Sequence, residues 1–181
     1  MKIPIKWRKL ESAELRELKA RGYVFEGMAF LAMYSGLNIS AVYSILRGVA
    51  VIEALLAVLC APIPWFISTL LYIAGYVSSR GLRSKILAEL FIASGATSLA
   101  VGCALLVAFS LALARLPDML IHQLETGALG FWGFLLEIVG FLLLAVLERT
   151  GLMYLLVAAP ISMGGVLVLM GVKRRPVLEV Y

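Results

Sequence analysis

Long apolar runs follow one another from about residue 41 to residue 172, and this succession constrains the fold more than any other feature. A helix needs roughly 17–25 apolar residues to cross a bilayer. Four or more such runs fit here, and only short loops separate them. The chain is 62% hydrophobic with a mean hydropathy of +1.00, whereas soluble domains are closer to half apolar. The sequence therefore predicts an all-α, multi-span transmembrane helix bundle with no room for a separate soluble domain.

Caps and helix breakers divide the chain into expected elements. Residues 7–21 predict an amphipathic N-terminal surface helix that ends at Gly22, and residues 23–37 predict an interfacial or half-inserted helix. Ser40 is expected to cap a first span over about 41–61, and Pro62-Ile63-Pro64 to turn the chain into a second span over about 64–79. A third span (about 86–114), a short helix (115–127), a fourth span (about 128–147) and a fifth span (about 152–172) follow.

These elements define three regions. Residues 1–40 are expected to form the charged surface helix plus the interfacial helix, residues 41–172 the transmembrane bundle, and residues 173–181 a basic tail. We prefer five spans because residues 23–37 are short for a crossing; six spans, with 23–37 inserted, are the alternative. Counting basic residues does not separate them, since either topology leaves about 11 inside and about 4 outside.

The net charge of +5 comes from basic residues at the two ends and in the loop 80–85. Membrane topology and anionic lipid account for such clusters, and no aromatic-basic pattern typical of nucleic-acid binding occurs. We expect an integral protein of the cell membrane with a cytoplasmic N-terminus. Its expected partners are the bilayer, anionic lipid at the basic segments, and further copies or other membrane subunits, but no nucleic acid.

Three glutamates inside the apolar runs, Glu53, Glu89 and Glu137, are the best functional lead. A carboxylate in hydrocarbon is costly, so we expect each to face protein, with Arg47 within reach. Each lies on a helical stripe of small residues that would let neighbouring helices approach closely. The predicted packing residues are Ala50, Ala54 and Ala57; Ala93, Ala96 and Ala100; and Gly130, Gly133 and Gly140.

Two functions fit these carboxylates. In the preferred interpretation they hold helices together, and the protein is a non-enzymatic structural or accessory subunit of a membrane assembly. In the alternative, Glu53 and Glu137 lie near mid-membrane and form the path of a small proton- or cation-coupled transporter or channel, since two close carboxylates in low dielectric raise one another's pKa.

A weaker candidate is Asp118, His122 and Glu125, which share one face of the short helix 115–127. This set could bind a divalent metal, but the preferred interpretation is the solvent-exposed polar face of an interfacial helix, because no fourth ligand or H-E-x-x-H pattern supports a site. No catalytic motif occurs, and we expect neither enzymatic activity nor a cofactor. Cys60 and Cys103 are expected to be packed free thiols. The single Asn and single Gln fit a thermophilic source.

Overall fold

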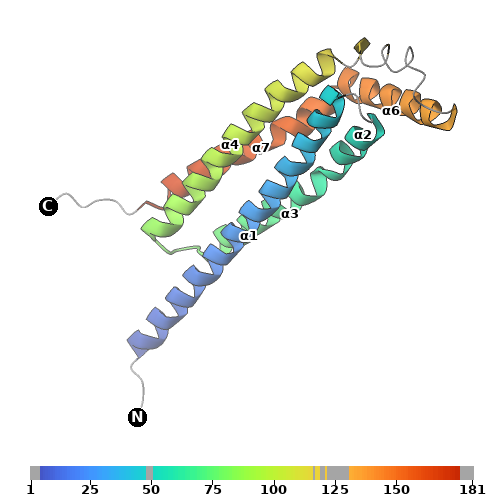
Figure 1. The fold of residues 1–181 in the computed structure, drawn as a ribbon. Helices are drawn as coiled ribbons and strands as arrows, with labels where there is room; N and C mark the ends of the chain where they lie inside the picture. The colour runs from blue at the N-terminus through green and yellow to red at the C-terminus, as the bar shows by residue number, and fades with distance from the viewer. Residues whose placement is uncertain (1–4, 48–50, 116, 119–120, 122–130, 176–181) are drawn as a thin grey trace.

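The computed structural model describes residues 5–47, 51–115, 117–118, 121 and 131–175 (Figure 1). Nearly all of these residues are helical, and none of them forms a strand. The helices are α1 (Ile5–Arg47), α2 (Val51–Cys60), α3 (Pro62–Ser78), α4 (Lys85–Ala114), α6 (Phe131–Arg149) and α7 (Leu152–Val172). The all-α fold class is therefore confirmed.

The N-terminal part of the chain forms one uninterrupted helix, α1, of 43 residues. The expected helix end at Gly22 and the expected cap at Ser40 are wrong, because both residues lie inside α1. A helix through a bilayer satisfies its own backbone, which outweighs the roughly 1 kcal/mol that one glycine costs. Polar side chains are satisfied locally as well, since Asn38 Nδ2 donates to the Tyr34 carbonyl at 2.9 Å.

The expected hairpin at Pro62-Ile63-Pro64 is also wrong. Ala61, between α2 and α3, is itself helical at φ −56° and ψ −35°. The Ala61 amide donates to the Ala57 carbonyl at 3.0 Å, and the Trp65 amide to the Ala61 carbonyl at 3.4 Å. Proline at the start of a helix costs only an N–H that is free in any case. The chain therefore crosses this segment without reversing, and Ile52–Ser78 forms one helical stretch of 27 residues.

The later helices agree with the sequence. The expected third span coincides with α4, and the Ser84 hydroxyl caps it by accepting from the Leu87 amide at 3.3 Å. The expected fifth span coincides with α7, which contains Pro160 and follows Gly151 in a left-handed conformation at φ +69°. The expected fourth span overlaps α6. The short helix 115–127 falls mostly outside the described residues.

α4 and α7 run antiparallel, and the first half of α1 lies at the same end of the bundle as the start of α4. A side chain on Gly95 would meet Gly164, and a side chain on Gly171 would meet Ala88, so α4 and α7 run in opposite directions. Ser84 at the start of α4 bonds to Glu17 of α1. The first half of α1 and the end of α7 therefore lie at the same end of the bundle, with α6 at the other end beside α2 and α7 (Figure 1). Five successive crossings would place them at opposite ends, so this arrangement disagrees with the five-span topology.

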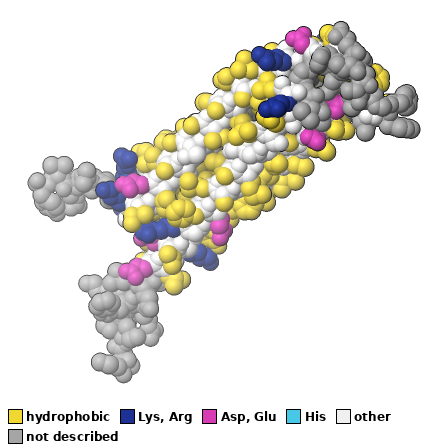
Figure 2. All heavy atoms as spheres, in the orientation of Figure 1, with side chains coloured by type: hydrophobic (Ala, Val, Ile, Leu, Met, Phe, Trp, Pro, Cys, Tyr) yellow, Lys and Arg dark blue, Asp and Glu magenta, His cyan; other side chains and the backbone are white. Residues whose placement is uncertain are grey.

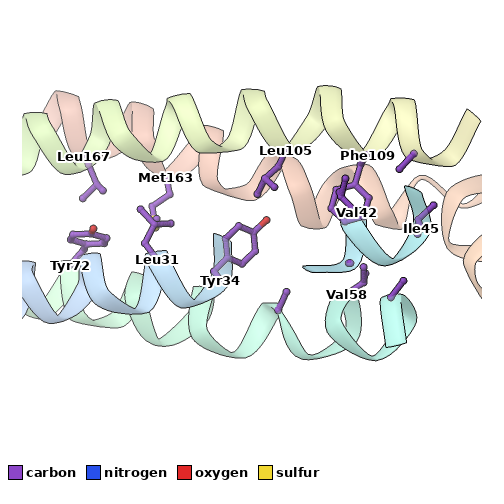
Figure 3. Close-up of a cluster of buried hydrophobic side chains, with 14 of the residues drawn as sticks. Leu31, Tyr34, Val42, Ile45, Val58, Tyr72, Leu105, Phe109, Met163 and Leu167 are labelled. Carbon is purple, nitrogen blue, oxygen red and sulfur yellow. The ribbon is translucent and has the colours of Figure 1, made fainter. Parts of the chain in front are cut away.

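Large side chains fill the interior between the α1–α3 pair and the α4–α7 pair (Figure 3). Tyr34, Tyr72, Phe91 and Phe109 are at most 2% exposed. Buried serines tie the helices together: Ser68 Oγ donates to the Gly27 carbonyl at 2.7 Å, and Ser98 Oγ to the Pro160 carbonyl at 2.7 Å. Packing contacts and interhelical hydrogen bonds of this kind hold bundles together in lipid.

The outer surface fits a bilayer. Among the described residues, three helices are long and apolar enough to cross a membrane: Ser12–Arg47, Ile52–Ser78 and Lys85–Ala114. A shorter apolar stretch, Ala158–Val172, lies in α7. Figure 2 shows hydrophobic side chains along the middle of the bundle, with charged side chains gathered towards its two ends.

Candidate functional site

The structure separates the three glutamates rather than gathering them. Glu137 is buried in α6 at 7% exposure and takes part in a side-chain interaction. Glu53 is exposed in the first turn of α2, and Glu89 is exposed on α4, 3.9 Å from the Lys85 ammonium. The prediction that all three glutamates face protein is therefore wrong for Glu53 and Glu89, which are exposed on the surface of the single chain.

The length of α1 explains why Glu53 does not lie in the middle of a span. α1 ends at Arg47 and α2, which begins at Val51, packs against it, so Glu53 lies near a bundle end and not about 20 Å along a span. A carboxylate in the first turn of a helix also interacts favourably with the helix dipole. Arg47 is exposed as well, and its guanidinium lies over the Tyr43 ring at 5.0 Å. Arg47 therefore bridges none of the glutamates in the described ion pairs.

The predicted small-residue stripes divide into buried and exposed sets. Ala54 and Gly140 are buried, while Ala57 and Gly133 are half-buried, as packing residues should be. On α4 the opposite face packs inward, through Gly95, Ser98 and Gly102. The predicted stripe is exposed instead, namely Ala93, Ala96 and Ala100. Ala50 and Gly130 lie outside the described residues.

The remaining candidates gain little support. Asp118 is exposed, whereas His122 and Glu125 lie outside the described residues, so the metal hypothesis is not tested. Within the described part, no three ligating side chains come together. Cys60 and Cys103 are free, as expected, but both are exposed rather than packed. Cys103 lies on the same outer face of α4 as Ala96 and Ala100.

The basic end of the bundle holds a polar cluster that the sequence did not reveal. Arg174, just after α7, is 7% exposed. Its Nη1 donates to the Ser79 carbonyl at 2.9 Å and also to the Ser79 hydroxyl, and its Nη2 donates to the Tyr76 carbonyl at 2.7 Å. The guanidinium stacks over the Tyr76 ring at 4.3 Å. Arg174 thus caps the end of α3 from the end of α7.

This position removes Arg174 from water. Burial lowers the pKa of the Arg174 guanidinium from its usual value, and Tyr76 acts in the opposite direction. The Arg174 Nε is buried and makes no hydrogen bond. From the sequence, residues 173–175 are expected only as the start of the basic tail, with anionic lipid as their partner. The spacing of Tyr76, Ser79 and Arg174 carries no local motif, so only the fold could bring them together.

A second polar tie joins α1 to α4 at the same end. The Ser84 hydroxyl donates to Glu17 Oε1 at 2.5 Å, and Glu17 also pairs with Arg21 one turn later. Together these partners, Ser84 first and Arg21 second, lower the pKa of the Glu17 carboxyl. Arg47 marks the far end of α1, so Glu17 lies some 45 Å along the helix and outside a hydrocarbon core of about 30 Å.

Two cavities lie one after the other along α3 and α7. An apolar groove of about 280 Å³ is lined from α3 by residues between Trp65 and Ile73, and from α7 by residues between Ser162 and Met170. A cavity of about 220 Å³ follows at the basic end, lined by Tyr76, Arg80, Arg83, Lys173 and Arg174 among others. The first could take an apolar chain and the second an anion.

Comparison with models of known protein families finds no match, and comparisons with curated proteins and with solved structures find none either. What the protein does is therefore inferred from its own residues and their geometry.

Proposed function

We propose that the protein is a multi-pass integral protein of the cell membrane whose crossings are α1, the combined α2–α3, α4 and α7. Their antiparallel order supports four crossings, because the first half of α1, the α3–α4 turn and the end of α7 share one end. The apolar length of three of these helices supports it too. In this proposal α6 lies at the opposite membrane surface.

The distribution of basic residues supports a cytoplasmic N-terminus. Twelve Lys and Arg residues belong to segments at the shared end: Lys6, Arg8, Lys9, Arg16, Lys19, Arg21, Arg80, Arg83, Lys85, Lys173, Arg174 and Arg175. Three, namely Arg47, Arg115 and Arg149, belong to the other end. Cytoplasmic segments carry the excess of positive charge. The four-crossing order thus gives twelve basic residues inside and three outside, a bias at least as strong as the roughly 11 to 4 of the five-span and six-span counts.

We infer a non-enzymatic structural or accessory role in a membrane assembly, made of copies of this chain or of other subunits. One observation carries this inference: the outer face of α4, formed by Glu89, Ala93, Ala96, Ala100 and Cys103, is exposed in the single chain. Small residues at helical spacing let another helix approach closely, whereas bulky apolar side chains are what lipid-facing positions usually carry. This surface fits a helix of a neighbouring subunit.

Steric substitution tests the assignment. Ala96→Trp adds bulk at the centre of the outer α4 face and should dissociate the assembly, measured as the mass of the purified complex in native detergent. Leu70→Trp is the matched control, because Leu70 is 50% exposed on α3 and already bulky. Unchanged mass in Ala96→Trp would contradict the role of this face.

The two native cysteines separate self-assembly from other partners. Cys103 lies on the outer α4 face and Cys60 lies on α2, and both are exposed. If copies meet through α4, the Cys60→Ser variant should form an oxidative dimer in membranes, and the Cys103→Ser variant should not. Loss of mass on Ala96→Trp without dimer formation points to a different subunit, which mass spectrometry of the purified complex identifies.

Buried Glu137 supports a second candidate, the proton- or cation-coupled path. Glu137 is 7% exposed in α6, and a buried carboxylate in a membrane protein is the kind of group such paths use. Because Glu53 does not join it, this candidate now depends on Glu137 alone. It predicts pH-dependent flux in proteoliposomes that Glu137→Gln abolishes, whereas the structural role predicts no flux in the wild type.

A further inference from the structure

The cavity at the basic end carries more positive charge than the fold itself uses. Arg80, Arg83, Lys173 and Arg174 line it, and none of its described lining residues is acidic. The carbonyl end of α3 offsets part of this charge, but a helix end carries only about half an elementary charge. Four cations around about 220 Å³ therefore leave a clear positive excess.

Arg174 gives an independent sign that an anion belongs there. It is 7% exposed, its Nε makes no hydrogen bond, and neither ion pair among the described residues includes it. A buried charge without a counter-charge is strongly unfavourable unless something compensates for it. Carbonyls of α3 provide hydrogen bonds, yet no carboxylate in the described part of the chain provides the opposite charge.

The adjoining groove specifies the rest of the ligand. Ile73 and Met170 line the groove, while Tyr76 and Lys173 line the basic cavity. Tyr76 is three residues after Ile73 and Lys173 is three residues after Met170, about 4.5 Å along the helix axis in each case. The two cavities therefore follow one another along the α3–α7 seam. The groove extends about 12 Å towards mid-membrane from Ile73 to Trp65. A ligand that fills both has an anionic head at the membrane surface and an apolar chain in the hydrocarbon.

We propose that the α3–α7 seam binds one anionic glycerophospholipid, with its phosphate among Arg80, Arg83, Lys173 and Arg174 and one acyl chain in the groove below. Basic pockets between membrane helices on the cytoplasmic side are a known way to hold such head groups. This site depends on membrane insertion but not on the outer face of α4, so lipid binding and assembly are tested separately.

Native mass spectrometry of the detergent-purified chain, supplied with phosphatidylglycerol or phosphatidylcholine, tests the site. One phosphatidylglycerol should stay bound, with affinity well above that of phosphatidylcholine. Arg80→Gln with Arg83→Gln should weaken phosphatidylglycerol binding about 25-fold, since each cation near an anionic lipid contributes about fivefold. Both residues are exposed, so the fold should survive. Arg47→Gln with Arg115→Gln, the same charge loss at the other end, is the control.

Two further measurements test the apolar groove and the head group separately. Val166→Trp, at a 49% exposed position that lines the groove, should reduce retention, whereas Leu169→Trp, 63% exposed outside the groove lining, should not. Inorganic phosphate and glycerol phosphate should fail to displace the lipid at equal concentration. Equal retention of the two lipids, equal loss in both arginine pairs, or displacement by the soluble phosphates would each overturn the proposal.

Discussion

Gly95 and Gly164 meet across the α4–α7 seam so closely that a Cβ on either would lie 2.7 Å from the other's carbonyl oxygen. Gly102 and Gly171 extend the same seam, because a Cβ there would lie 2.6 Å from Ile161 and 2.7 Å from the Ala88 carbonyl respectively. The sequence suggested small-residue contacts on α4, but the chain uses these glycines for them and leaves the alanine face outside.

The first prediction follows from this seam. Gly164→Ala should lower the free energy of unfolding by about 1–3 kcal/mol, because backbone cannot move aside as a flexible side chain can. Gly165→Ala is the adjacent control, since nothing lies within 4 Å of a Cβ there, and it should be neutral or slightly stabilising. Denaturant titration in mixed micelles, followed by tryptophan fluorescence, measures both. Equal losses of unfolding free energy in the two variants would mean that the backbones of α4 and α7 do not approach each other this closely.

The buried serines give a second prediction. Ser98→Ala removes the hydrogen bond to the Pro160 carbonyl and should cost about 0.6–1 kcal/mol, which is typical of interhelical bonds in membranes. Ser110→Ala is the control, because Ser110 is exposed and bonds only to Leu106 of its own helix. The same titration should show no measurable change for Ser110→Ala, and a comparable loss there would remove the interhelical explanation.

A third prediction concerns pH. The pKa of Glu17 is lowered from its ordinary value of 4.5, so its contribution to stability is complete above about pH 4.5 and is lost as the pH falls through the lowered pKa. The contribution should be about 1 kcal/mol or less, because the side chain is a quarter exposed. Glu17→Gln should reduce the fall of the denaturant unfolding midpoint as the pH is lowered. Glu14→Gln, which removes an exposed charge from the same helix, should keep the wild-type slope.

The path of the chain through Pro62 and Pro64 gives a fourth prediction. Ile63 is 62% exposed but lies about 16 Å from Ile52 and about 22 Å from Ser78, which is near mid-membrane. In a Cys60→Ser, Cys103→Ser background, Ile63→Cys should resist a membrane-impermeant maleimide from both sides. Arg83→Cys should react from the cytoplasmic side. Labelling of Ile63→Cys from the outside would instead support a hairpin turn at Pro62-Ile63-Pro64.

Composition and apolar runs predicted the helical class and the limits of α4 and α7 well, because length and hydropathy are properties of each segment alone. The separation of α1 from α2 was missed because no proline or charge cluster stands between Arg47 and Val51 in the sequence, while two prolines stand where the helix continues. Because α1 ends at Arg47, Glu53 lies near a bundle end and not near mid-membrane as expected. The Arg174 cluster was missed for a different reason: its partners are 95 and 98 residues away and meet only through tertiary packing.

The unbroken α1 also has a consequence for the end of the bundle at which the chain begins. Among the side chains of α1 described from Ser12 onward, Ala20 is the first that the bundle buries, so the turns from Ser12 to Lys19 carry mostly exposed side chains over about 12 Å of helix. The head-group layer is only about 5–8 Å deep on each side of a bilayer. In the four-crossing arrangement proposed above, an upright α1 extends beyond the head groups over this length, so exposed charged side chains such as Glu14, Arg16 and Lys19 would reach the aqueous phase at that membrane surface.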